Sequence, residues 1–296
     1  MRKTPHREKL NAAIANPKCS ADAPLLQEIL SEYNGWITRM QALETTGAER
    51  VQDLVRFLNE YKDRVEVDMI MERGSAFLRR QKGQLKLDNS ILEEFLIHLV
   101  SPLVLGESAN FPIETGPQTA FMSFAFRPLS LPNLNEKPEV VLKLKDQDFT
   151  IGRTIHYKFS PDSQFDDGFT RKGSLFLAVL AAECKVNYDK TMFQECAGTA
   201  TRLKHGCLIA KYFALVEYLD MQPEDVRLTD IDNVFLLRKA KRLPFEKRGS
   251  IDAVRAQREM CPISAEVILK FVEEIKTFFE TTWYDPDEAL QRGSFV

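Results

Sequence analysis

Between residues 24 and 104, apolar residues recur at helical spacing and so predict amphipathic helices. Three such stripes begin at Leu25, Val51 and Ile91. Between the second and third stripes, two β-prone runs within 65–87 flank Gly74-Ser75, which favours a hairpin. Two helices, a hairpin and a helix are typical of a winged-helix module. The pattern therefore predicts a mainly helical, winged-helix-like domain over residues 1–105.

The next segment is rich in proline. Six of the fourteen prolines lie between residues 101 and 138, a spacing that forbids long helices. The same segment carries four phenylalanines that favour packing onto another surface: Phe111, Phe121, Phe124 and Phe126. We predict a linker or extended strap over residues 106–137, with the domain boundary inside it.

After Pro138 the pattern alternates between strands and helices. The expected strands cover residues 139–145, 149–159, 174–187 and 233–240. The expected helices cover residues 191–219 and 262–283, and the second begins at Pro262. This alternation predicts an α/β domain over residues 138–296, with a mixed central sheet flanked by helices.

The strand expected at 174–187, which contains "LFLAVLAAECKVN", ends in charged residues. Side chains alternate between the two faces of a strand, so its even positions form one apolar face. Its odd positions are apolar until Glu183 and Lys185, which project side by side at the carboxyl end, where α/β proteins usually bind ligands. An unpaired buried charge costs several kcal/mol, so this pair must satisfy each other, a metal or a substrate. Cys184 between them belongs to the apolar face and is expected in the core.

Composition and charge add few restrictions. The chain has 296 residues, 44% of them hydrophobic, and a formal net charge of -3, so any nucleic-acid surface must be a local patch. Five widely spaced cysteines without a CxxC pair favour free thiols in a reducing cytoplasm and disfavour a zinc site. No apolar run approaches the roughly 18 residues of a membrane span. We therefore expect a cytoplasmic protein without a membrane partner.

A second carboxylate lies upstream of Glu183. Asp162 is in the turn before the strand, and it meets Glu183 if residues 149–159 pair antiparallel with 174–185. Two carboxylates and the backbone carbonyl of Cys184 would suit Mg²⁺, which retains waters and accepts phosphate oxygens. Lys185 would then stabilise charge on the phosphorane and position the attacking water. These residues suit metal-assisted phosphodiester hydrolysis. Asp148, Asp166 and Asp167 are alternatives to Asp162, because the hairpin register is open.

Pro161-Asp162 followed by Glu183-Cys184-Lys185 resembles the PD…(D/E)xK signature of type II restriction endonucleases and several repair nucleases. The resemblance implies a mixed sheet with flanking helices, Mg²⁺ as cofactor, double-stranded DNA as substrate, and Asp162, Glu183 and Lys185 as the catalytic set. It also implies that Gln194 or Glu195 takes a supporting position on the next helix. Around "AAECKVNYDK" the chain is similar to restriction endonucleases that work as two non-identical subunits on asymmetric CCTNAGC-type sites. A second, non-identical subunit is therefore the expected partner, and a homodimer is the alternative.

Two basic segments are candidates for DNA-backbone contacts, because clustered Lys and Arg bind phosphates without reading sequence. The first segment contains Arg73, Arg79, Arg80 and Lys82, and the second contains Arg238, Lys239, Lys241 and Arg242. The alternative is a charged edge that discourages aggregation for the first segment and a solvated loop for the second, and contact with DNA is the favoured interpretation of both.

The leading hypothesis is a Mg²⁺-dependent type II restriction endonuclease subunit that cuts one DNA strand. A repair or recombination nuclease with the same chemistry is a second hypothesis. A non-enzymatic winged-helix DNA-binding regulator is a third. The recognised bases do not follow from the sequence, because readout depends on which side chains reach the base edges.

Overall fold

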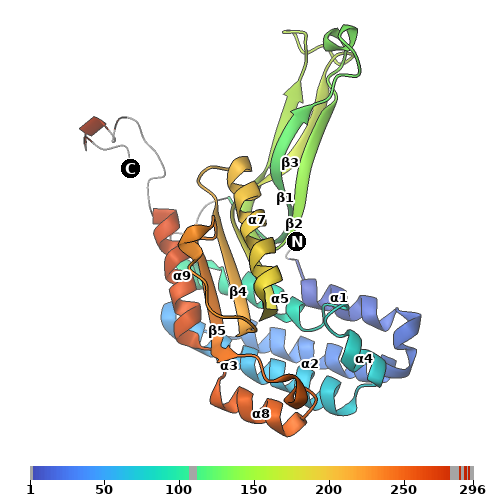
Figure 1. Ribbon diagram of the computed structural model, residues 1–296, viewed down its shortest axis with the longest axis vertical. Helices are drawn as coiled ribbons and strands as arrows, with labels where there is room; N and C mark the ends of the chain where they lie inside the picture. Colours follow the sequence, from blue (N-terminus) through green and yellow to red (C-terminus); the bar gives the residue numbers. More distant parts are fainter. Residues whose placement is uncertain (1–2, 107–111, 281–286, 288–289, 292, 294–296) are drawn as a thin grey trace.

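A five-stranded mixed sheet forms the centre of the computed structural model, which describes residues 3–106, 112–280, 287, 290–291 and 293 (Figure 1). The strands are neighbours in chain order: β1 (Glu114–Phe126), β2 (Val140–Phe159), β3 (Arg171–Tyr188), β4 (Lys211–Leu219) and β5 (Asn233–Lys241). β2 is antiparallel to β1 and β3, whereas β3, β4 and β5 are parallel to one another. The expected mixed sheet with flanking helices is therefore confirmed.

Helices form most of the N-terminal region and the remaining layers. The N-terminal set is α1 (Pro5–Ile14), η1 (Pro17–Asp22), α2 (Ala23–Gln41), α3 (Gly47–Lys62), η2 (Asp63–Met71), α4 (Ala76–Gln81), α5 (Asn89–Leu99) and α6 (Pro102–Leu105). Later helices are η4 (Pro132–Asn135), α7 (Lys190–Gly206), η5 (Val226–Leu228), η6 (Phe245–Lys247), α8 (Ile251–Met260) and α9 (Ala265–Glu280). Among the described residues, no helix has the length and apolar character needed to span a membrane.

The hairpin expected within residues 65–87 is wrong. The π-helix η2 continues α3, and α4 follows after Gly74, with the Ser75 hydroxyl accepting the Leu78 N–H at the start of that helix. The β-branched residues Val65 and Val67 are buried by packing, and such tertiary contacts override β propensity. The Gly74-Ser75 pair thus connects two helices, and the region has no wing.

The expected linker at 106–137 is also corrected, because it contains β1, although residues 107–111, including Phe111, lie outside the described part. Pro117 falls at a register shift between Gly116 and Gln118, where a missing N–H is tolerated. β1 pairs with the first part of β2. The proline-rich segment is therefore an integral strand of the sheet.

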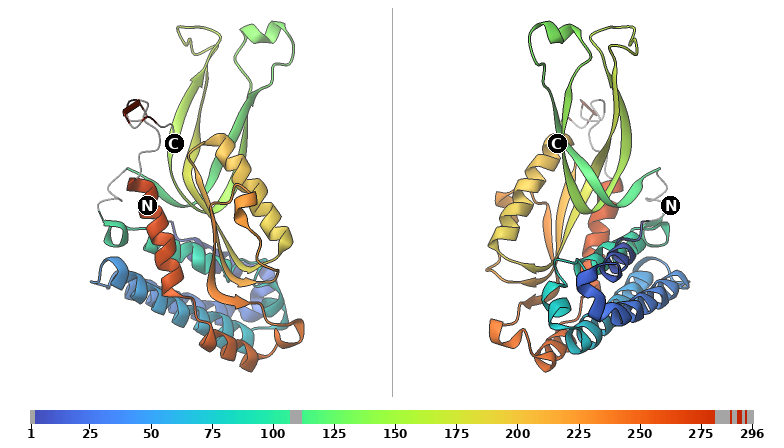
Figure 2. Two further views of the ribbon diagram at one scale, coloured as in Figure 1. Left: turned by 60° about the vertical axis from the view of Figure 1, so that its left-hand side comes forward. Right: turned by 90° about the vertical axis from the view of Figure 1, so that its right-hand side faces the viewer.

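The two strands expected at 139–145 and 149–159 form one long strand, β2, which serves two hairpins. Its first part pairs with β1 and its last part with β3, and the register shifts at Gly152. A Cβ at Gly152 would lie 2.2 Å from the Leu177 carbonyl oxygen, so only glycine fits. Both hairpin loops stand at the same end of the molecule (Figure 2), and the Phe126 and Phe159 ring centroids are 5.2 Å apart. The two hairpins form a projecting pair, which we call the β-arms.

The helix expected at 191–219 is shorter than predicted. It ends as α7 at Gly206, where a Cβ would approach the Met122 carbonyl oxygen to 2.7 Å, and residues 211–219 form the buried strand β4. A short apolar run does not distinguish a buried strand from a buried helix, which explains the error. The strand expected at 233–240 is confirmed as β5. The helix expected at 262–283 is confirmed as α9 up to Glu280, and residues 281–283 are outside the described part.

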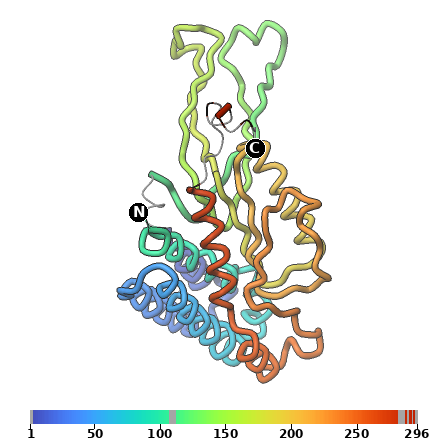
Figure 3. The backbone as a smooth tube through the Cα atoms, turned by 90° about the vertical axis from the view of Figure 1, so that its left-hand side faces the viewer, coloured from blue at the N-terminus to red at the C-terminus, as the bar shows by residue number. Residues whose placement is uncertain are grey.

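The sheet buries both faces under helices. One face packs against α7, and the other packs against α9 and the N-terminal helices, beside which α9 runs (Figure 3). The predicted continuous even face of β3 is interrupted, because a register shift opposite Gly152 places Phe176 and Ala178 on the α7 side but Leu180 on the other. Cys184 is fully buried, as expected.

A group of buried charged side chains joins the N-terminal helices to β4, β5 and α8. We call it the sealed cluster, and it consists of Lys62, Glu66, Glu217, Arg238 and Arg258. Glu217 lies 2.8 Å from Lys62 Nζ and 2.9 Å from Arg238 Nε. Arg258 binds Glu66 at 2.5 Å, and Lys62 also contacts Glu66. Buried charges need such partners, so this cluster fixes the position of the helical layer against the sheet.

Candidate active site

Asp148 and Glu183 lie at the point where β2 and β3 separate. The antiparallel register pairs Phe149 with Ala182, and the next positions along it are Asp148 and Glu183. Beyond this point β2 continues with β1, and β3 continues with β4. The Cys184 N–H donates to Asp148 Oδ2 at 3.0 Å. The fork between the strands therefore holds the Asp148 carboxylate against the backbone of the Glu-Cys-Lys segment.

Lys185 and Glu183 form an ion pair on β3, as the alternation of side chains predicts. Lys185 Nζ lies 2.8 Å from Glu183 Oε1, and the Tyr212 hydroxyl lies 3.5 Å from Glu183 Oε2. Burial opposes the charged form of Lys185, but the Glu183 carboxylate outweighs it, with a further contribution from Asp148, so the pKa of Lys185 is raised. Lys185 is therefore an ammonium ion that faces both carboxylates.

A third carboxylate, Glu93, reaches the site from α5. The Asn89 side chain at the start of this helix accepts the Val186 N–H at 3.1 Å, which ties α5 to the end of β3. One turn later, Glu93 is only 3% exposed, and its Oε1 has no hydrogen-bond partner among the described residues. Burial, with the Asp148 carboxylate as second cause, raises the pKa of Glu93 to about 7. The nearby lysines therefore only partly offset the burial of the Glu93 carboxylate.

The sequence interpretation missed Glu93. Its signal was present, because Glu93 and Glu94 interrupt the apolar run "ILEEFLIHL" of a helix whose residues are buried on all sides. A carboxylate in such a helix needs a partner. Glu94 has one, since it accepts the His6 backbone N–H at 3.1 Å. Glu93 is the carboxylate left for chemistry.

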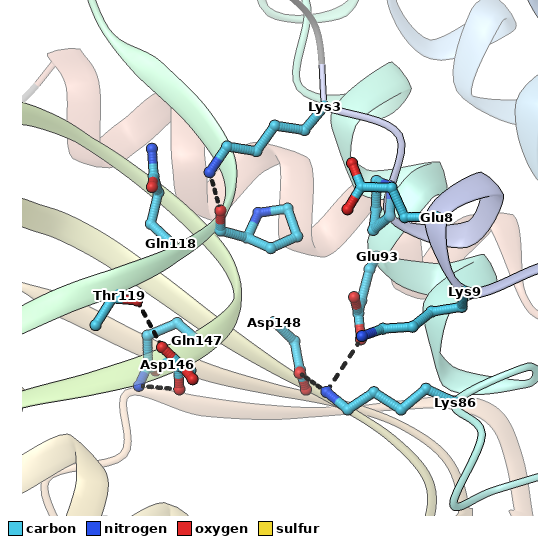
Figure 4. Close-up of a pocket in the computed structure, with 12 residues that line it drawn as sticks. Lys3, Glu8, Lys9, Lys86, Glu93, Gln118, Thr119, Asp146, Gln147 and Asp148 are labelled. Atoms are coloured by element: carbon cyan, nitrogen blue, oxygen red, sulfur yellow. Dashed lines mark hydrogen bonds and ion pairs between the residues drawn. The ribbon is translucent and has the colours of Figure 1, made fainter. Parts of the chain in front are cut away.

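A cavity of about 420 Å³ opens beside Asp148 and Glu93 (Figure 4). Lys86 points into it from the turn before α5, with Nζ 3.2 Å from Asp148 Oδ1 and 3.6 Å from Glu93 Oε1. The other charged lining residues are Lys3, Glu8, Lys9 and Asp146. The three carboxylates and two lysines, which we call the open cluster, are Lys86, Glu93, Asp148, Glu183 and Lys185.

The open cluster fits a divalent cation such as Mg²⁺. Within the described ranges, no group of three His, Cys, Asp or Glu side chains forms a complete metal cage. Mg²⁺ does not need one, because it binds through one or two carboxylates and keeps waters and phosphate oxygens as further ligands. Asp148 and Glu183 supply two hard oxygen donors at the fork, and the Glu93 carboxylate is near Asp148. The donor set is therefore appropriate for this metal.

Asp162 is not part of this site, which corrects the expectation. Residues 149–159 do pair antiparallel with β3, but this arrangement places the connecting loop at the beginning of β3, whereas Glu183 is near its end. At ~3.3 Å per residue, the two positions are roughly 35 Å apart along the strand. Asp162 Oδ1 and Oδ2 accept the N–H groups of Gln164 and Asp166 within the loop. Asp166 and Asp167 share this loop, so of the four candidates only Asp148 reaches the fork.

The supporting residues expected on the next helix are exposed. Gln194 and Glu195 lie on the solvent side of α7, whereas Cys196 beside them is buried. No contact of either side chain with Glu183 or Lys185 is present among the described residues. Glu93, in contrast, lies near Asp148 and lines the same cavity.

The candidate DNA contacts differ in accessibility. Arg238 is wrong as a DNA contact, because it is 1% exposed and binds Glu217 inside the sealed cluster. Arg73, Arg79 and Arg80 are exposed, and Arg73 pairs with Glu28 at 2.7 Å. Lys239 and Lys241 are exposed, while Arg242 is half-buried and binds Asp220 at 2.8 Å.

The two basic segments meet in space although they are far apart in sequence. Lys82 and Arg242 line one cavity of about 190 Å³, together with Asn187, two residues after Lys185. Seven of the eight expected basic residues, all except Arg238, are at least partly exposed and remain candidates for contact with DNA.

Comparisons with known proteins agree with this geometry. The family model "Bpu10I restriction endonuclease" matches residues 84–295, a region that starts just before Lys86 and contains the whole open cluster. Solved structures that resemble the chain include the "native BbvCI A2B2 tetramer at low resolution". That match has a TM-score of 0.63 and 18% identity, and covers 92% of this chain and 94% of the other. No curated protein sequence matches the chain. The chain therefore belongs to the Bpu10I restriction endonuclease family of type II site-specific deoxyribonucleases, a class of DNA-binding enzymes that use a divalent metal ion.

Proposed function

We propose that this subunit cuts one strand of its recognition site in a Mg²⁺-dependent reaction centred on Asp148, Glu183 and Lys185. The supporting observation is the fork between β2 and β3, which brings both carboxylates to one point with Lys185 beside them. Asp148 and Glu183 would hold the metal, with Glu93 as a third carboxylate. Bound Mg²⁺ would polarise the phosphate and favour ionisation of the attacking water. Water adds to phosphorus, the bond to the 3′ oxygen breaks, and that oxygen leaves with a proton to give a 3′-hydroxyl and a 5′-phosphate.

The side chains of the subunit have separate tasks in this reaction. The Cys184 N–H holds Asp148 Oδ2, so one carboxylate oxygen has a fixed position. Lys185 Nζ lies 2.8 Å from Glu183 Oε1, so it is placed to donate hydrogen bonds to the attacked phosphate beside the metal ligands. Charge that develops on phosphorus oxygens is therefore stabilised by a fixed ammonium group.

Exposed basic residues next to the open cluster suit the DNA backbone. Lys82 and Arg242 border the cavity beside Asn187, and Arg73, Arg79, Arg80, Lys239 and Lys241 extend this basic character outward. Such residues position the duplex through its phosphates and carry no base specificity. We assign them to backbone contact.

One open cluster hydrolyses one phosphodiester bond, so a double-strand break needs a second site. The similar solved structure is named as an A2B2 tetramer, which supports a second, non-identical subunit as partner, with a homodimer as the alternative. All five cysteines are free, which favours a reducing compartment such as the cytoplasm.

Asp148→Asn, compared with Asp162→Asn, tests the assignment. Plasmid DNA is digested by the full chain together with its partner subunit, and nicked and linear products are separated on a gel. Asp148→Asn should lower the cleavage of its own strand at least about a thousandfold, since metal-assisted charge stabilisation contributes several kcal/mol. Nicked plasmid should then accumulate if the partner cuts the other strand.

Asp162→Asn is the matched control, since it removes the same carboxylate roughly 35 Å from the fork. It should leave strand cleavage at the wild-type rate. Loss of cleavage in Asp162→Asn with normal cleavage by Asp148→Asn would refute the proposed site.

A further inference from the structure

Lys86 stands where a divalent cation would bind. Its Nζ contacts Asp148 Oδ1 at 3.2 Å and lies 3.6 Å from the buried Glu93 Oε1, as Figure 4 shows. The other Asp148 oxygen, Oδ2, is already occupied by the Cys184 N–H. The Lys86 ammonium therefore covers the Asp148 oxygen that remains for a metal ion, together with the unpartnered Glu93 oxygen.

The backbone of Lys86 is held by hydrogen bonds, whereas its side chain is partly exposed to solvent. Its N–H donates to the Gly83 carbonyl at 3.0 Å, and its own carbonyl accepts the Ser90 N–H at 3.2 Å. The side chain, however, is 45% exposed, whereas Lys62 of the sealed cluster is fully buried. Its partners Asp148 and Glu93 are only 11% and 4% exposed, so the Lys86 ammonium can leave them when another cation takes its place.

The cavity at Lys86 offers a phosphate group several cationic partners. Three lysines and four carboxylates line it, so a DNA phosphate at its mouth would bind the ammonium groups of Lys3, Lys9 and Lys86 and leave the carboxylates to a cation. Phosphate attracts lysine in competition with Asp148 and Glu93. A bound duplex would then uncover both carboxylates for the metal.

We propose that Lys86 is a positioning residue that couples metal uptake to DNA binding. In the DNA-free subunit it competes with the divalent ion for Asp148 and Glu93, and on DNA binding it turns to a phosphate and releases them. The inference rests on the proposed function, because it takes Asp148 and Glu93 as metal-site residues. Such coupling is reciprocal, so the same lysine affects the affinity for DNA and for metal.

The test measures binding and does not depend on cleavage. Mn²⁺ binding to the DNA-free full chain is followed by electron paramagnetic resonance for wild type, Lys86→Gln and Lys3→Gln. Lys86→Gln should bind Mn²⁺ about fivefold more tightly than wild type, which corresponds to an ion pair whose lysine is partly exposed. Lys3→Gln, which removes one charge from the same cavity, should resemble wild type, because Lys3 contacts the Pro117 carbonyl and neither metal-site carboxylate.

A second measurement follows the other side of the coupling. Binding of a random-sequence duplex is measured without divalent metal over a range of salt concentrations. If Lys86 moves to a phosphate, Lys86→Gln should lower the magnitude of the slope of log K against log [salt] by about 0.9. Unchanged or weaker Mn²⁺ binding by Lys86→Gln, equal effects of Lys86→Gln and Lys3→Gln on Mn²⁺ binding, or an unchanged slope for Lys86→Gln would each overturn the proposal.

Asp148→Asn separates this inference from the proposed function. If Asp148→Asn binds Mn²⁺ as well as wild type, the metal site itself is misassigned. If Asp148→Asn loses Mn²⁺ binding while Lys86→Gln behaves as wild type, the site is correct and only the role of Lys86 fails.

Discussion

The sealed cluster and the open cluster both bring charged side chains from the N-terminal helices to the sheet, but their charge balances are opposite. The sealed cluster contains three cations and two carboxylates, all within 6% exposure. A further carboxylate, Asp63, binds Arg258 at 2.9 Å from the more exposed rim. The open cluster contains three carboxylates and two lysines, beside a cavity. The sealed cluster needs no ligand to balance its charges. The open cluster has one carboxylate more than it has lysines.

The unpartnered acceptors differ in their surroundings. Among the described residues, Glu217 Oε1 in the sealed cluster and Glu93 Oε1 in the open cluster both lack a hydrogen bond, but Glu217 Oε1 lies 2.8 Å from the buried Lys62 Nζ, whereas Glu93 Oε1 lies 3.6 Å from Lys86 Nζ beside a cavity. A buried acceptor without a donor is suited to a cation. Charge deficit combined with access to solvent therefore distinguishes the functional cluster from the structural one.

The largest expected effect on folding comes from breaking the sealed cluster. Glu217→Gln leaves Lys62 and Arg238 without their shared carboxylate, and removing one partner of a buried ion pair typically costs about 3–5 kcal/mol. The free energy of unfolding, measured by denaturant titration, should fall by that amount. Glu266→Gln, at an exposed carboxylate that binds Lys239, should leave it unchanged. Equal stability of Glu217→Gln and wild type would remove the structural role of the cluster.

Neutralising a carboxylate of the open cluster should raise the free energy of unfolding, whereas neutralising Glu217 in the sealed cluster lowers it. The pKa of Glu93 is about 7 in the folded state, above its unfolded value, so protonation stabilises the fold and this contribution is lost as pH rises through 7. At pH 8 without divalent metal, Glu93→Gln should raise the free energy of unfolding by about 2 kcal/mol. At pH 4.5 this gain in the free energy of unfolding should disappear. DNA cleavage by Glu93→Gln should be lower than cleavage by wild type. A destabilised Glu93→Gln at pH 8 would contradict the assigned charge deficit.

His6 is a buried titratable group outside both clusters, and it is held by hydrogen bonds and not by an ion pair. His6 is bound by Ser90 and Tyr61 at 2.8 Å each, and burial lowers its pKa to about 3. The unfolded chain therefore binds a proton that the folded chain does not, and stability is lost as pH falls below about 6.5. Unfolding at pH 5.5 should cost about 1 kcal/mol less than at pH 7.5 through His6 alone. His6→Asn should lack this component, and an identical pH profile in the variant would contradict it.

The two site residues on β3 could be predicted from the sequence, but the two carboxylates that other elements bring to them could not. Period-2 alternation placed Glu183 and Lys185 together, because it depends only on local geometry. Asp148 and Glu93 depend on which strand and helix pack beside β3. The polar run around Asp146 and Asp148 resembled a break between two strands, so the carboxylate in the middle of β2 was given less weight than Asp162.

Arg238 and β4 illustrate the same limit. Arg238 belongs to a basic run in the sequence, yet its ion pair with Glu217 on the neighbouring strand buries it. A helix over residues 211–219 does not predict this ion pair, because Glu217 then has no strand on which to lie beside Arg238. Family membership removes support from the two alternative hypotheses, a repair nuclease and a non-enzymatic regulator. The regulator also depended on a wing that the structure does not contain.

The β-arms place their loops far from the catalytic centre, so the two regions can evolve independently. Their loops stand well away from the fork, roughly 35 Å along the strands for the loop that contains Asp162 and roughly 26 Å for the loop between β1 and β2. Substitutions at the arm tips therefore do not alter the distances among Asp148, Glu183 and Lys185. Mutation can reshape these tips while selection holds the chemistry constant, so the fold can acquire new surface properties without rebuilding its catalytic centre.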